Sequence, residues 1–278
     1  MPSNKIIDVV IPSFNRLELL MLCIDSVRKQ TYKINKIIIV DDNSSFSHDD
    51  FWMSMKENNV EQGDIVFHKK NENKGACHSR NLGVELSNAE YIAFLDDDDM
   101  WEAEHIERLI NTFTQPDIVL SYSGKKITNF SSGSVRKSLR VIPNESQRSH
   151  MLKCNYPGST SSILVRKNAF YEAGKFDESL PAIQDYDFYL RLVDVGTFTT
   201  SNVFTLIYRN DTNIKITNQL NKARVAFNVI TKKINLNSRN ILAKTIFVQN
   251  IKKAIVSRQY GFVFLFTLDF LKVLTKSD

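Results

Sequence analysis

Cysteine is scarce in this chain: the 278 residues include three, Cys23, Cys77 and Cys154. An odd number of scattered cysteines argues against a disulfide framework and is typical of a reducing, cytoplasmic compartment. The five histidines form no HExxH or CxxC–HxxxH arrangement, so the sequence does not predict a zinc site.

Long hydrophobic runs are also lacking. No stretch reaches the roughly 18 apolar residues that a membrane span needs, and the polar residues 1–5 do not resemble a signal peptide. Hydrophobic residues make up 42% and charged residues 24% of the chain, which is ordinary for a soluble globular protein. We therefore expect a cytoplasmic protein with one substantial core.

Acidic residues are nearly absent from the last part of the chain. Residues 216–278 contain 11 Lys and Arg but two Asp and Glu, whereas residues 1–215 contain 25 and 29. This split predicts that the segment 216–278 faces an anionic surface, either a membrane or a nucleic acid. No nucleic-acid-binding motif accompanies the charge, so we expect no nucleic-acid partner.

The apolar run 262–274 allows two interpretations. A basic amphipathic helix there suits peripheral attachment to the anionic inner face of the cytoplasmic membrane. Alternatively, its aromatic side chains pack on the rest of the chain or on a second subunit of a homo-oligomer. These aromatic residues are Phe262, Phe264, Phe266 and Phe270.

The first 125 residues alternate between short apolar runs and amphipathic stretches. Such alternation predicts an α/β fold in which helices flank a mostly parallel central sheet, as in Rossmann-like proteins. Asn15 with Glu18 forms a capping pattern before the first helix. Strands are predicted at 6–11, 36–40, 64–68, 91–95 and 118–122, and helices at 17–27, between 40 and 64, at 76–87 and at 102–113.

Beyond residue 129 the pattern is looser. The polar stretch 131–149 indicates a long excursion or flexible loop. Further strands are predicted at 161–165 and within 197–208, and helices at 168–173, at 185–195 and from 220 onward. We expect a catalytic domain at 1–215, with a nucleotide half at 1–125 and an acceptor half at 126–215, followed by a basic helical extension at 216–278.

Polar side chains follow three of the predicted strands at the point where each strand ends. Pro12–Asn15 follow the first strand, Asp41 and Asp42 the second, and Asp96–Asp99 the strand 91–95. Ligands of open α/β sheets bind at the carboxyl ends of the strands, so these loops should meet. Clustered aspartates suit Mg²⁺ or Mn²⁺, although a solvated turn with surface acids is the alternative. The pattern predicts a metal-dependent enzyme that handles phosphates.

The motifs together resemble a known family, glycosyltransferase family 2 of the bacterial surface-polysaccharide type, which has the type A nucleotide-sugar-binding fold. The likeness covers roughly residues 5–215. The motifs that carry it are Val9-Val-Ile-Pro-Ser-Phe-Asn-Arg16, Ile38-Ile-Val-Asp-Asp-Asn-Ser44, Asn73-Lys-Gly75 with Ser79-Arg-Asn-Leu-Gly83, Tyr91-Ile-Ala-Phe-Leu-Asp-Asp-Asp-Asp-Met-Trp101, Gly158-Ser-Thr-Ser-Ser-Ile-Leu-Val-Arg166, Gly174-Lys-Phe-Asp-Glu178 and Gln184-Asp-Tyr-Asp-Phe-Tyr-Leu-Arg-Leu192.

This resemblance implies transfer of a sugar, with inversion, from a nucleotide diphosphate donor to an acceptor hydroxyl of a glycan or lipid-linked glycan. A UDP-sugar donor and Mn²⁺ or Mg²⁺ are expected. By likeness to the family's Asp-x-Asp motif, Asp98 binds the metal and Asp96 contacts the ribose or a metal-bound water. Asp97 lies on the donor side, and Asp99 is either a supporting or a structural acid.

The resemblance also assigns residues to the nucleotide base. Asp42 accepts a hydrogen bond from the uracil ring, Phe14 and the Pro12–Ser13 backbone frame the base together with Asn15, and Arg80 lies near the base or phosphates. Each residue also has a structural interpretation. Asp42 could be a turn residue, Arg80 a surface cation that pairs with Glu85 or another acid, and Phe14 a core side chain.

Asp185 matches the family's general base, although a carboxylate in the first turn of a helix is also a normal partner of the helix dipole. Asp187, two residues later, faces elsewhere on the helix. The chain departs from the family pattern at Gln184, where a Glu is usual, and at Asp211, which is nearest to a position where many relatives place a metal-side His.

Two other functions compete. An aspartate-nucleophile phosphohydrolase would need Asp-x-Asp-x-Thr/Val, which Asp98-Asp99-Met100 does not fit. A catalytically weakened carbohydrate-binding or scaffold protein is favoured by Gln184 and disfavoured by the presence of both Asp98 and Asp185.

Overall fold

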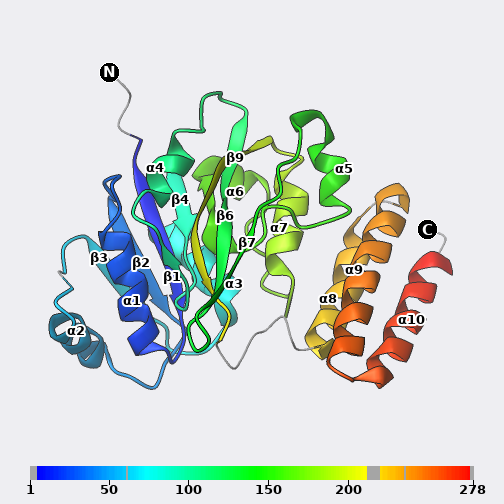
Figure 1. Ribbon diagram of the computed structural model, residues 1–278, viewed down its shortest axis with the longest axis horizontal. Helices are drawn as coiled ribbons and strands as arrows, with labels where there is room; N and C mark the ends of the chain where they lie inside the picture. The colour runs from blue at the N-terminus through cyan, green and yellow to red at the C-terminus, as the bar shows by residue number, and fades with distance from the viewer. Residues whose placement is uncertain (1–4, 61, 212–219, 235, 276–278) are drawn as a thin grey trace.

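A computed structural model describes residues 5–60, 62–211, 220–234 and 236–275 (Figure 1). Among these residues nine strands form one sheet, in the order β3-β2-β1-β4-β8-β6-β9-β5, with β7 paired to β6. Helices flank the sheet, and three helices follow it at the C-terminal end (Figure 1). The predicted fold class is confirmed.

The first half of the sheet is wholly parallel. Its strands are mostly apolar in their central pairs, because helices cover both faces. Val10, Ile38 and Phe94, which lie side by side in the register, are each completely buried. Helices α1, α2 and α3 connect these strands. The bounds are β1 (Ile7–Ser13), α1 (Leu17–Arg28), β2 (Lys36–Asp41), α2 (His48–Glu57), β3 (Ile65–Lys69), α3 (Gly75–Leu86) and β4 (Tyr91–Phe94).

The second half of the sheet is mixed. Strand β8 runs antiparallel to both β4 and β6, and β9 runs parallel to β6. At the periphery, β5 pairs antiparallel with β9, and β7 pairs antiparallel with β6. The bounds are β5 (Met100–Trp101), α4 (His105–Ile110), β6 (Ile118–Asn129), β7 (Ser134–Ser138), η1 (Asn144–Ser146), α5 (Gln147–Met151), η2 (Thr160–Ser162), β8 (Ile163–Arg166), α6 (Lys167–Glu172), α7 (Gln184–Leu192) and β9 (Thr197–Arg209).

Two local predictions are wrong. Asn15 does not cap α1; the residue before this helix is Arg16, which makes no side-chain cap, and Asn15 has φ 53° with its Oδ1 accepting from Ser45 N at 2.8 Å. The turn after β1 instead joins the loop after β2. The stretch 131–149 is not a flexible loop throughout, because β7 forms a hairpin with β6 and α5 follows. The side chains of β7 are all exposed, so no apolar pattern marks the strand.

The C-terminal region is helical, as predicted, and consists of α8 (Leu220–Lys233), α9 (Leu236–Val256) and α10 (Tyr260–Thr275). Phe227 and Ile230 of α8 belong to the same core as Phe188 and Tyr189 of α7. The predicted domain boundary at 215/216 lies outside the described residues. Within those residues, each helix is too short or too polar to cross a lipid bilayer.

Gly83 allows α3 to lie close against β1. A Cβ at this position would overlap Cγ1 of Val10, which is buried in the core. We expect Gly83→Ala to lower the free energy of unfolding by about 1–3 kcal/mol, as overpacked cores do. Chemical denaturation measures this change.

Gly261 of α10 provides the matched control, because a Cβ there would meet nothing within 4 Å. Gly261→Ala should raise the free energy of unfolding by about 0.5–1 kcal/mol through helix propensity. Equal effects of the two substitutions would contradict the close packing of α3 on β1.

Candidate active site

The loops after β1, β2 and β4 meet at one edge of the sheet, as the sequence predicts. Phe14 N donates to Asp97 Oδ2 at 3.1 Å, which joins the first loop to the third. Asn15 N donates to Ser44 Oγ at 2.7 Å, which joins the first loop to the second. Backbone hydrogen bonds therefore hold the three polar loops together.

Two arginines offset the charge of the acidic run. Arg16 Nη1 lies 2.9 Å from Asp97 Oδ1 and 3.0 Å from Asp98 Oδ2. Arg80 Nη2 lies 2.5 Å from Asp96 Oδ1. The sequence analysis did not identify Arg16 as a site residue; its position in the loop after the first strand, opposite an acidic loop, is the signal that could have indicated it.

The four aspartates have different surroundings. Burial raises the pKa of Asp97 to about 6, with Arg16 opposing the shift and Asp98 adding to it. Burial also raises the pKa of Asp99 well above its usual range, and the charges of Asp98 and Asp96 add to this effect. The side chains of Asp96 and Asp98 keep solvent contact.

Asp99 has a structural role. Its Oδ2 accepts a hydrogen bond from Ser161 Oγ at 2.7 Å, and its Oδ1 accepts one from Arg209 N at 3.1 Å. Ser161 Oγ also accepts from Asp96 N at 3.1 Å. This carboxylate thus ties the acidic loop to η2 and to the end of β9.

The carboxylates suit a metal ion that is shared with a substrate. Within the described residues, no three His, Cys, Asp or Glu side chains lie close enough to hold an ion by themselves. Mg²⁺ is commonly bound by one or two carboxylates, with phosphate oxygens and waters completing its shell. The solvent-accessible Asp96 and Asp98 would fit such a site, with phosphate oxygens supplying the remaining ligands.

Asp42 is buried beside the start of α3. Its Oδ1 accepts from Lys74 N and its Oδ2 from Gly75 N, both at 2.8 Å, and Lys70 Nζ lies 2.5 Å from Oδ1. The side chains of Asp42 and Lys70 are both buried. Asp42 therefore fixes the helix start; its role toward a nucleotide base stays a prediction.

Two structural interpretations from the sequence are wrong. Phe14 is not a core residue, because its side chain is largely exposed. Arg80 is not a surface cation: it is buried, and Glu85 pairs instead with Lys175 at 2.6 Å. The Arg80 guanidinium lies 5.6 Å from the centre of the Phe176 ring, and its buried Nε has no hydrogen-bond partner among the described residues.

Asp185 occupies the first turn of α7. Its Oδ1 accepts from Tyr186 N at 2.8 Å, and its Oδ2 accepts from Asn155 Nδ2 at 3.0 Å. Burial raises the pKa of Asp185, against the effect of these hydrogen bonds and of Arg80. Ile183, just before the helix, has φ 53°, a strained conformation for a β-branched residue that aims the helix start.

Three residues near Asp185, in sequence or in space, have defined contacts of their own. Asn155, which the sequence analysis did not identify, is held by Gly158 N donating to its Oδ1 at 3.0 Å. Asp187 is buried and pairs with Arg191 at 2.6 Å, so it faces away from Asp185 as expected. Gln184 Nε2 donates to the Leu180 carbonyl at 3.0 Å.

Asp211 follows β9 and lies beside the β6–β7 turn. Arg209 Nη1 is 3.5 Å from its Oδ1, and Ser131 Oγ donates to its Oδ2 at 3.4 Å. These contacts place the carboxylate against the hairpin. Its predicted substitution for a metal-side His stays a prediction.

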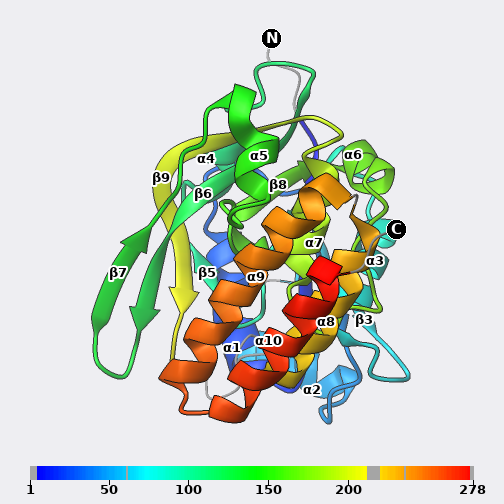
Figure 2. The same cartoon turned by 90° about the vertical axis from the view of Figure 1, so that its right-hand side faces the viewer.

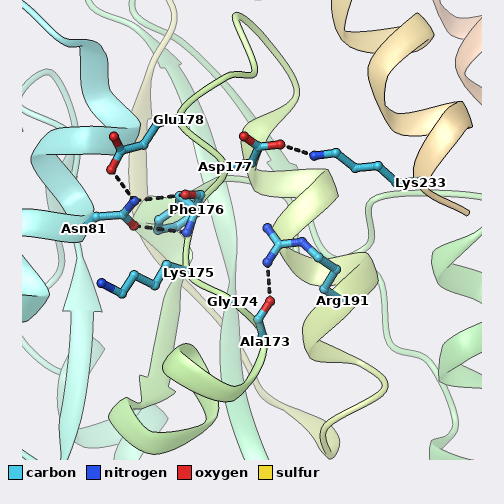
Figure 3. Close-up of a pocket in the computed structure, with 9 residues that line it drawn as sticks. All are labelled: Asn81, Ala173, Gly174, Lys175, Phe176, Asp177, Glu178, Arg191 and Lys233. Atoms are coloured by element: carbon cyan, nitrogen blue, oxygen red, sulfur yellow. Dashed lines mark hydrogen bonds and ion pairs between the residues drawn. The ribbon is translucent and has the colours of Figure 1, made fainter.

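A surface hollow of about 480 Å³ lies between α3, the Gly174–Glu178 loop, α7 and α8 (Figure 3). Asn81 bridges the loop by donating to Phe176 O at 2.9 Å and to Glu178 Oε1 at 2.8 Å. Lys233 pairs with Asp177 across the hollow (Figure 3). Because these polar groups form hydrogen bonds and an ion pair with one another, we interpret the hollow as a packing contact between α3, the Gly174–Glu178 loop and α8, and not as a ligand site.

Comparisons with known proteins agree with this geometry. The family model described as Glycosyl transferase family 2 matches residues 8–175. The chain is 31% identical over 195 residues to the Escherichia coli UDP-Glc:alpha-D-GlcNAc-diphosphoundecaprenol beta-1,3-glucosyltransferase WfaP, covering 69% of this chain and 72% of that protein. It is 29% identical over 197 residues to an uncharacterized glycosyltransferase of Haemophilus influenzae. That match covers 69% of this chain but less than two thirds, 64%, of the relative.

A solved structure shares the fold. Staphylococcus aureus TarS 1–349 in complex with UDP-GlcNAc superposes with a TM-score of 0.68. The match covers 96% of this chain and 81% of that one at 14% identity, so it speaks for the fold alone.

Loss of the Asp42 carboxylate should destabilise the protein. Asp42→Ala leaves Lys70 buried without its partner and frees two amides of α3, so we expect a loss of about 3 kcal/mol in the free energy of unfolding. The double variant Asp42→Ala/Lys70→Met should recover much of this loss. Denaturation of the four proteins in the cycle measures the coupling, and strictly additive effects would contradict it.

Proposed function

Because this chain belongs to glycosyltransferase family 2, we propose that it transfers a sugar from a UDP-sugar to a hydroxyl of a lipid-linked glycan, with inversion at the anomeric carbon. One observation carries the proposal. Arg80 pairs with Asp96 of the acidic run, and its charge also acts to lower the pKa of Asp185, which supports a site shared by the two carboxylates.

The names of related proteins support the choice of substrates. WfaP uses UDP-Glc and GlcNAc-diphosphoundecaprenol, and TarS 1–349 binds UDP-GlcNAc. A uridine diphosphate donor and a diphospholipid-linked acceptor are therefore the first substrates to test. Which sugar is moved depends on contacts that differ among such enzymes.

On the donor side we assign Asp98 as the principal metal ligand and Asp96 as its partner toward the ribose or a metal-bound water. A bound Mn²⁺ or Mg²⁺ offsets the charge of the diphosphate and so makes it a better leaving group. Asp97 accepts hydrogen bonds from Phe14 N and from Arg16 Nη1. These contacts position the loop after β1, in which Pro12, Ser13 and Asn15 would frame the base. The buried Arg80 supplies a further positive charge for a phosphate.

On the acceptor side we assign Asp185 as the general base. Its carboxylate takes the proton of the acceptor hydroxyl while the acceptor oxygen bonds to the anomeric carbon and the bond to the diphosphate breaks. Attack from the face opposite the leaving group inverts the configuration. Tyr186 N and Asn155 orient the carboxylate, and the raised pKa makes it a stronger base than an exposed Asp.

A second function is a glycosyltransferase-like carbohydrate-binding or scaffold protein with weakened catalysis. Gln184 favours it, because the family usually has a Glu there and this amide is engaged with the Leu180 carbonyl. The presence of Asp98 and of a positioned Asp185 favours the active enzyme. Gln184→Glu distinguishes the two, because only a chain weakened by Gln184 should transfer faster with the Glu.

Asp185→Asn should lower the transfer rate about 10²–10⁴-fold, the usual contribution of a general base. Donor binding should stay nearly unchanged, because Asp185 lies on the acceptor side. Nucleotide release from UDP-sugars in the presence of a diphospholipid acceptor measures the rate, and UDP titration measures binding. A variant that keeps most of its transfer rate would exclude Asp185 as the base.

The pH profile provides the control. Asp185 acts when deprotonated, so the rate should fall as the pH drops through its folded pKa, which burial places above the ordinary value of about 3.9. The acidic limb should be missing in the Asp185→Asn variant. If the rate of that variant still fell at the same acidic pH, the titrating group would be a residue other than Asp185.

A further inference from the structure

The outermost helix, α10, is apolar on both sides. Phe266 is buried toward α8 and α9, as expected of a packed helix. The opposite side exposes a row of large apolar residues at spacings of three and four, which places them on one face. These are Tyr260 and Phe264, exposed by 63% and 66%, with Leu268, Leu271 and Leu274. Figure 1 shows that this helix lies farthest from the sheet.

Helix α9 lies beside α10 (Figure 2). Ile241, Val248 and Ile255 are exposed at a spacing of seven residues, so they lie along one side of the helix. Lys244 and Lys252 are exposed among them. The outer side of α9 is therefore apolar and basic at once, unlike that of α10.

The charge around this face has a single sign. Residues 220–234 and 236–275 include ten Lys and Arg and one acidic residue, Asp269. Asp269 is buried, and it accepts hydrogen bonds from Arg224 Nη2 at 3.2 Å and Asn228 Nδ2 at 3.3 Å. Throughout this described part of the region, no acidic side chain is exposed.

We propose that the outer face of α9 and α10 docks on an anionic lipid surface. An amphipathic arrangement of exposed aromatic and aliphatic side chains flanked by lysines is the pattern that binds at the headgroup boundary. A second copy of the chain would bring the same positive charges face to face, which disfavours self-association through this surface. A large exposed apolar face marks an interaction site, and the positive charge around it favours an anionic lipid surface as the partner.

The inference goes beyond the transfer reaction and does not depend on it, since lipid binding is measured without any substrate.

The test uses the full chain with vesicles of phosphatidylcholine, with and without phosphatidylglycerol. We expect cosedimentation with the anionic vesicles, weakened by salt, and an affinity at least about tenfold lower for Phe264→Glu/Leu271→Glu, which places charge within the apolar row. Met53→Glu is the matched control, because Met53 is 59% exposed on α2 and belongs to the nucleotide half. It should bind as the parent does.

Folding and oligomeric state complete the experiment. Circular dichroism and thermal unfolding confirm that each variant is folded, and Lys244→Glu/Lys252→Glu provides a second pair that leaves the apolar row intact. The lysine pair should also weaken binding to anionic vesicles. Failure of the parent to bind anionic vesicles would overturn the proposal, as would binding by both double variants that equals that of the parent. A concentration-dependent dimer that is lost in Phe264→Glu/Leu271→Glu, without lipid binding, would assign the face to a second copy.

Discussion

Mutual repulsion among Asp96, Asp97, Asp98 and Asp99 is the constraint on which this site depends. Four carboxylates follow the same buried strand, and three sets of groups stabilise them. Arg80 holds Asp96, Arg16 holds Asp97 and Asp98, and hydroxyl and backbone groups hold Asp99. These partners come from α3, the loop after β1, η2 and β9. The acidic run therefore organises both halves of the domain around one edge of the sheet.

The same arginines prepare the site for an anionic substrate. A nucleoside diphosphate with its metal brings both negative and positive charge, which can replace the internal pairing between arginines and carboxylates. Arg80 is central to this proposed exchange, because it is buried and pairs with Asp96, and the carboxylates of Asp96 and Asp185 raise its pKa against the effect of burial.

The sequence predicts the parallel half of the fold well, because its strands are uninterrupted apolar runs between polar loops. It predicts the second half less well. Strand β7 has no buried side chain. Helix α4 covers His105–Ile110 of the predicted 102–113, and Glu102 N donates instead to Thr205 O of β9. The resemblance to the family points to Asp98 and Asp185, but it does not point to Arg16 or Asn155, whose contacts join segments 81 and 30 residues apart.

Titration of UDP into the protein with and without Mn²⁺ tests the central claim most directly. The described residues offer too few acidic ligands to hold the ion alone, so nucleotide and metal should bind together. Calorimetry should show UDP binding at least about tenfold tighter in Mn²⁺ than in EDTA, a coupling of about 1.4 kcal/mol, and Asp98→Asn should abolish the difference. Equal UDP affinity with and without the ion would contradict the account.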